Sequence, residues 1–151
     1  MNVNTILNEA IASVKGAQFA GIVGTDGLSV AMAYHPNAAE LDVDIELAEL
    51  ELADLTSRAA AAANRIGAGY VRDLVLETDA MLMLATQIIP GYYGVLGVLS
   101  EIANLGKARF ALQAMVERVR VELSPAVGCA NHELPRPQDH LLKDMIEHLL
   151  R

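Results

Sequence analysis

One stretch near the middle of the chain limits what the sequence can fold into. Residues 40–55, ELDVDIELAELELADL, carry seven acids and no base among nine apolar residues. The first eight residues alternate as in a half-buried strand, but the continuation LAELELADLTSRAAAAANRIG has helical spacing and is too long for a strand. We therefore predict a helix that begins between positions 41 and 46, with Asp42 or Asp44 as its N-cap. Gly67 or Gly69 would end it.

This helix has two apolar stripes rather than one. The broad stripe is wide enough to cover a sheet and consists of Leu41, Ile45, Ala48, Leu52, Leu55, Ala59, Ala62, Ala63 and Ile66. The narrower stripe consists of Val43, Leu47, Leu50 and Ala61. Acids separate the two stripes, with Asp42, Glu46 and Glu49 on one flank and Glu40, Asp44 and Glu51 on the other. One sheet cannot cover both stripes, so the helix needs a second neighbour.

Length and composition indicate one domain with a substantial core. The chain has 151 residues, of which 53% are hydrophobic. No run of eighteen apolar residues occurs, and the first fourteen residues lack the features of a secretory signal, so we expect a cytoplasmic protein without membrane insertion. A net charge of −8 argues against binding to nucleic acid or to anionic lipid and favours basic or neutral protein partners.

Periodicity and turn residues predict an α+β fold with a five-stranded antiparallel sheet and long helices. A first helix ends before Gly16, and two strands joined by the tight turn TDG follow. After the central helix come three strands and a last long helix. In order, these elements are expected at 4–14, 17–24, 28–34, 70–78, 80–88, 93–100 and 104–123.

The C-terminal part of the chain has a different composition. We expect one domain over 1–123, a Pro- and Gly-punctuated linker over 124–136, and a short amphipathic helix over 137–151. The apolar side of that helix would carry Leu141, Leu142, Met145, Ile146, Leu149 and Leu150.

The sequence contains no recognisable catalytic or cofactor-binding motif. No phosphate-binding G-x-x-x-x-G-K-[ST] loop is present, and GYYGVLG lies within a strand pattern. Cys129 and His132 lie three apart, near His140 and His148, which suggests a metal site. Structural zinc normally shows two paired ligand clusters, so we favour a solvated linker. We therefore expect no catalytic residues, no cofactor and no metal.

The order of elements and several local strings resemble the Roadblock/dynein light chain family, and within it the bacterial MglB-like branch. The matching strings are GAQFAGIVGTDGLSVAM after the first helix, the acidic start of the central helix, and NLGKARFAL at the start of the last helix. The resemblance covers roughly residues 4–123.

That resemblance implies a homodimer in which the central helix meets its counterpart across a two-fold axis. The strand YVRDLVLET would pair across the same axis, since it would otherwise be a long unprotected edge. The implied dimer-interface residues are Val43, Leu47, Leu50, Ala61, Val71 and Leu74. The implied partner-binding residues are Glu46, Glu49, Arg58, Ala60, Ala61 and Arg65.

The resemblance also implies a function. Members of the MglB-like branch look like partners of small Ras-like GTPases, so this chain would be a non-enzymatic platform that binds such a GTPase and stimulates its GTP hydrolysis. An arginine finger is not required, and we interpret Arg58, Arg65 and Arg72 as salt-bridge or rim residues. Two alternatives remain open: a scaffold without effect on GTP turnover, and a metal or small-ligand sensor that uses Cys129 and His132.

Overall fold

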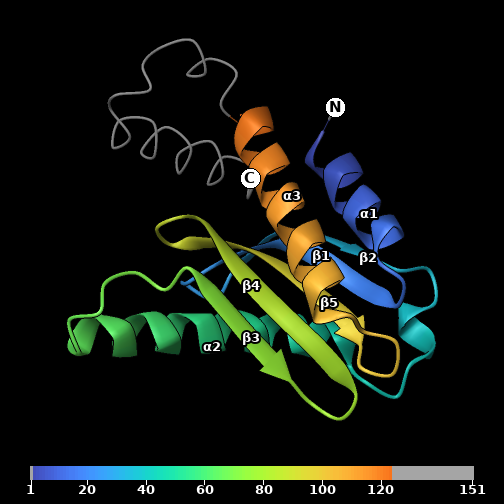
Figure 1. The fold of residues 1–151 in the computed structure, drawn as a ribbon, viewed down its shortest axis with the longest axis horizontal. Coiled ribbons are helices and arrows are strands. Elements are labelled where there is room, and N and C mark those ends of the chain that lie inside the picture. The colour runs from blue at the N-terminus through green and yellow to red at the C-terminus, as the bar shows by residue number, and fades with distance from the viewer. Residues whose placement is uncertain (1, 124–151) are drawn as a thin grey trace.

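The computed structural model describes residues 2–123. The linker expected at 124–136 and the helix expected at 137–151 lie outside these residues. The elements are α1 (Val3–Ser13), β1 (Ala17–Gly24), β2 (Ser29–Tyr34), the 3-10 helix η1 (Ala38–Glu40), α2 (Ile45–Arg65), β3 (Asp73–Glu77), β4 (Met81–Ile89), β5 (Tyr92–Leu99) and α3 (Leu105–Leu123). They form three layers, with α1 and α3 on one side of a sheet and α2 on the other (Figure 1).

The sheet has five strands in the order β2-β1-β5-β4-β3, and every neighbouring pair is antiparallel. The predicted α+β class is therefore confirmed. The predicted turn between β1 and β2 is present too, with Gly27 at φ 87° and the Asp26 carboxylate accepting a hydrogen bond from the Leu28 N–H at 3.0 Å. Asp-Gly suits this turn because glycine tolerates a positive φ without steric cost.

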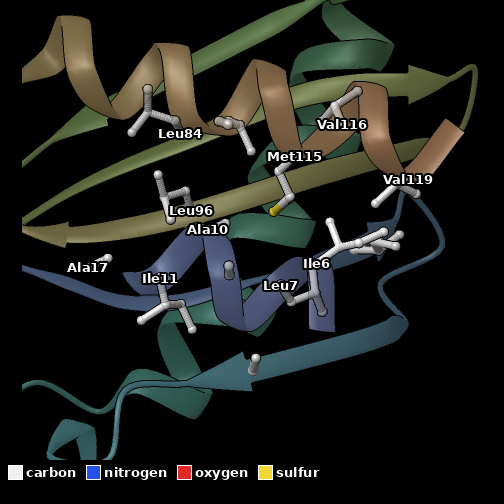
Figure 2. Packing of buried hydrophobic residues seen from close by; sticks show 14 of the residues in the cluster. Ile6, Leu7, Ala10, Ile11, Ala17, Leu84, Leu96, Met115, Val116 and Val119 are labelled. Carbon is white, nitrogen blue, oxygen red and sulfur yellow. The ribbon is translucent and has the colours of Figure 1, made fainter. Parts of the chain in front are cut away.

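The larger core lies between the sheet and the pair α1 and α3. Figure 2 shows Ile6 from α1, Met115 and Val119 from α3 and Leu96 from β5 converging in this layer. The helix α3 can approach β5 closely because Gly94 carries no side chain: a Cβ added there would lie 2.6 Å from the Val116 side chain.

The smaller core lies on the other face, under α2. Its centre is Phe19, which is fully buried and lies across the backbone of Gly97, where an added Cβ would come within 2.1 Å of the ring. Ile45, Leu52 and Ala53 of α2 pack into this cluster. Only β1, β2 and β4 have extensive contacts with α2, which leaves β3 largely outside the area that this helix covers.

The ends of α2 explain the ambiguous pattern at 40–47. The helix begins at Ile45, because the Asp44 carboxylate accepts a hydrogen bond from the Leu47 N–H at 3.0 Å and caps the first turn. The alternating residues before it form η1 and bends instead of a strand. The helix ends at Arg65, shortly before Gly67 at φ 76°, as predicted. The sequence did not predict η1, and β3 is shorter than the stretch 70–78.

Candidate protein-interaction site

Half of α2 packs on the sheet and the other half does not. The buried residues of this helix are Ile45, Glu49, Leu52, Ala53 and Thr56. From Ser57 to Arg65 no residue is buried. The broad stripe, expected to be able to cover a sheet, does so at Ile45 and Leu52 but not towards the C-terminus, since Leu55 is 38% exposed and Ile66 is 80% exposed.

The narrower stripe of α2 is open to solvent in the described chain. Leu47 and Leu50 lie one turn apart and are 50% and 51% exposed, and Ala61 is exposed further along the helix. Val43, just before the helix, differs from them because it is half-buried against the smaller core. The three helical residues form an uncovered apolar line on the side of α2 that does not contact the sheet.

Glu49 does not lie where the sequence predicts it. The sequence places Glu49 among the acids between the two apolar stripes and among the implied partner-binding residues, but its side chain is buried and accepts a hydrogen bond from the Tyr34 hydroxyl at the end of β2. Burial raises the pKa of Tyr34, and the hydrogen bond to Glu49 and the negative charges of Glu49 and Glu46 raise it further. Glu49 therefore joins α2 to β2, while Glu46 remains exposed.

The strand β3 forms one edge of the sheet. It pairs with β4 on one side, and on its other side no strand of residues 2–123 is present. Leu74 lies opposite Ala85, so its half-buried side chain is on the same face as α2 and contacts the smaller core. Val71, just before the strand, is half-buried, and its carbonyl accepts a hydrogen bond from the Tyr93 hydroxyl at 2.5 Å.

The expected partner-binding residues lie mostly on the part of α2 that leaves the sheet. Arg58 forms an ion pair with Asp54 at 3.0 Å, and both side chains are largely exposed. Arg65 and Ala61 are exposed, and Ala60 is half-buried. The structure therefore brings these four residues onto one projecting segment, and places Glu49 elsewhere.

Sequence analysis missed one residue of this surface. Tyr70 is 74% exposed in the loop after α2, and together with Ala60 and Asn64 it lines a shallow cavity of about 300 Å³. An aromatic residue directly after two closely spaced glycines, as in GAGYV, is the pattern that points to it. Tyr70 lies in a loop, outside the helices and strands whose packing buries other aromatic side chains.

The described part of the chain shows neither a cluster of metal-binding side chains nor a membrane-spanning helix. Residues 2–123 contain no group of three His, Cys, Asp or Glu side chains that is arranged to hold a metal ion. Over the same residues, no helix combines the length and the apolar character needed to cross a membrane. Cys129, His132, His140 and His148 lie outside the described residues.

A five-stranded antiparallel sheet with two helices on one face and one long, partly uncovered helix on the other is the architecture of Roadblock/LC7 domains, and the chain has a Roadblock-like fold of the MglB type. It is similar to MglC from Myxococcus xanthus, with 28% identity, 82% of this chain and 100% of that chain covered, and a TM-score of 0.59. It is similar also to a Roadblock/LC7 domain from Streptomyces avermitilis, with 20% identity, coverage of 82% and 98%, and a TM-score of 0.63.

A third neighbour is MglB in a tetrameric arrangement, with 19% identity, coverage of 77% and 83%, and a TM-score of 0.65. No protein-family profile and no curated protein matches the sequence. The predicted resemblance is thus confirmed at the level of the fold, and the neighbours support a Roadblock-type regulatory protein.

Proposed function

We propose that this protein is a cytoplasmic homodimer that binds a small Ras-like GTPase and stimulates its GTP hydrolysis without an active site of its own. One observation carries the proposal: α2 exposes Leu47 and Leu50 on the side away from the sheet, and the same chain has an edge strand, β3, that pairs with no strand of residues 2–123 on one side. Isolated apolar side chains on a surface are common, but here they lie in line on one helix, and the chain also carries unpaired backbone groups along β3.

Self-association would satisfy both features at once. A second copy of α2 packed against Leu47, Leu50 and Ala61 would remove a few hundred Å² of apolar surface per chain, which at about 25 cal/mol per Å² is several kcal/mol before the association entropy is subtracted. The free edge of β3 would pair with the same strand of the second copy, so that the backbone N–H and C=O groups of both edges are satisfied. Leu74 lies between these two contacts.

The projecting half of α2 suits a protein partner. Alanines occupy five consecutive positions, 59–63, and their small side chains let another backbone come close. The acids at the start of the helix would attract a basic surface on the partner. Because Arg58 is held by Asp54 and is largely exposed, it fits a rim residue better than a catalytic finger. Stimulation would then come from positioning groups that belong to the GTPase itself.

The test uses a purified small Ras-like GTPase from the same organism as this protein. Binding is measured with the GTPase loaded with GDP and with a non-hydrolysable GTP analogue, and GTP turnover is measured with and without this protein. We expect tighter binding to the GTP form and faster turnover. Equal affinity for both forms with unchanged turnover would leave a scaffold as the function, and no binding at all would contradict both.

A matched pair of variants locates the binding surface. Ala61→Arg places a long charged side chain on the exposed half of α2 and should weaken docking or the dimer. Ala12→Arg makes the same chemical change at an exposed position of α1, on the opposite face of the sheet. If both variants reduce binding equally, α2 is not the surface that the GTPase contacts.

A further inference from the structure

A second apolar surface lies on the opposite side of the sheet, in the groove between α1 and α3. This groove has a volume of about 550 Å³ and is lined by Ile6, Ala10, Phe110, Ala114, Met115 and Arg118, among others. Phe110 stands at its rim and is 74% exposed. A smaller cavity of about 250 Å³ continues it past Arg118 to Val121, which is 66% exposed.

No part of residues 2–123 fills this groove. The ring of Phe110 and the side chain of Val121 lie eleven residues apart on α3, so the exposed apolar line extends over about 16 Å of helix, interrupted by the ion pair of Arg118 with Glu9 of α1. An apolar groove of this length between two helices is typical of the sites that accept an amphipathic helix.

We propose that residues 137–151 of the same chain bind in this groove. The sequence of that segment, PQDHLLKDMIEHLLR, places six large apolar residues on one side of a helix. A helix of fifteen residues is about 22 Å long, which matches the apolar line from Phe110 to Val121 with one turn to spare. In this arrangement the leucines and Ile146 cover Phe110 and Ala114, and the polar side of the segment faces solvent.

The length of the connection permits binding within one chain. Residue 123, the last of α3, follows directly on the end of the groove at Val121. Thirteen residues, 124–136, separate it from the segment, and they can span about 43 Å when extended. Returning along α3 from residue 123 to Phe110 requires only about 20 Å. The segment therefore reaches the whole groove without strain in the linker.

Tethering also favours this occupant over a free partner. A segment joined by a short linker has an effective concentration of about 1 mM near its site, so even weak binding keeps the groove occupied.

A single tryptophan reports on this contact, because the natural chain contains none. In the full chain with Phe110→Trp, we expect emission at the short wavelengths of a buried indole. Adding Leu142→Asp and Ile146→Asp should shift the emission to longer wavelength. Arg151→Asp, which changes the net charge by the same two units on the polar side of the segment, should leave the emission unchanged. Identical, solvent-like emission in all three proteins would overturn the proposal.

Cross-linking provides a second measurement that does not depend on aspartate variants. With Cys129→Ser, the pair Ala114→Cys and Ile146→Cys should form a disulfide on mild oxidation and remain a single chain on a non-reducing gel. The pair Ala39→Cys and Ile146→Cys, with Ala39 exposed before α2, should not. A cross-link between two chains would show instead that a second copy supplies the segment, and failure to cross-link would contradict the proposal. Neither experiment involves a GTPase, so the outcome is independent of the proposed function.

Discussion

The hydroxyl of Tyr34, at the end of the edge strand β2, donates a hydrogen bond to the buried carboxylate of Glu49 in the second turn of α2. This contact joins two elements that are otherwise held by a small apolar core. A carboxylate taken out of water needs hydrogen-bond donors, and Tyr34 supplies one. The pair therefore fixes the position of the half of α2 that lies on the sheet.

Removal of the Tyr34 hydroxyl should destabilise the protein. We expect Tyr34→Phe to lower the free energy of unfolding by about 1–2 kcal/mol, because the carboxylate of Glu49 loses its donor while staying buried. Urea denaturation of the full chain measures this loss. Tyr70→Phe, at a largely exposed tyrosine, is the control and should be neutral. An unchanged midpoint for Tyr34→Phe would mean that water replaces the hydroxyl at no cost.

The same pair predicts a dependence on pH. The pKa of Tyr34 is raised in the folded protein above the value of about 10 for an unfolded tyrosine. The folded protein favours the neutral hydroxyl, so this group stabilises the fold fully at pH values below the pKa of unfolded tyrosine. The stabilisation is lost as the pH rises from that value towards the higher pKa in the folded protein. The difference in unfolding free energy between the wild type and Tyr34→Phe should be constant from about pH 7 to 9 and should shrink above about pH 10. A constant difference up to about pH 11 would contradict the assignment.

Charge on the narrower stripe of α2 should prevent dimerisation. Leu47→Asp with Leu50→Asp places two acids in a contact that would be dry in the dimer, and we expect a folded monomer because both side chains are already half-exposed in one chain. Light scattering at micromolar concentration measures the mass. The control is Leu28→Asp, at a similarly exposed leucine in the turn between β1 and β2. A wild-type protein that scatters as a 16.1 kDa monomer would refute the dimer.

A methyl group at position 97 should disturb the smaller core. In Gly97→Ala the new Cβ would lie 2.1 Å from the ring of Phe19, which is fully buried, so the ring has to move against its neighbours. We expect a loss of about 1–3 kcal/mol of stability, measured by thermal or urea unfolding. Gly106→Ala, in the first turn of α3 with its nearest atom at 3.4 Å, should be neutral or slightly stabilising.

Association with the GTPase should slow as salt is added. If the negative charge of the chain steers a basic partner, surface charges are screened beyond roughly 10 Å at about 0.1 M salt, and the association rate should fall between low and physiological ionic strength. Stopped-flow measurements at several salt concentrations test this. A rate independent of salt would show that α2 binds without electrostatic steering.

Most of the fold could be predicted from the sequence because its signals are local. The Asp-Gly turn, the alternation in the strands and the glycine after α2 each act over a few residues. What the sequence did not reveal depends on contacts between distant residues. Burial of Glu49 depends on its hydrogen bond with Tyr34, fifteen positions earlier in the chain. Leu55 and Ile66 are exposed because α2 extends beyond the sheet, and helical periodicity does not tell where a helix leaves its sheet. The exposed line of Leu47, Leu50 and Ala61 on α2 could be predicted because it is periodic, whereas Tyr70 belongs to no periodic pattern.

From Ser57 onwards, α2 contributes no buried side chain to the fold. Natural selection on that segment is therefore less constrained by core packing than on the first half of the helix, and a substitution there that preserves the helix changes the exposed surface at little cost in stability. Thr56, fully buried two turns after Glu49, marks where this freedom begins. A lineage that duplicated such a gene would be able to change the partner of one copy by mutations in a single helical segment, while its sheet and core stayed the same.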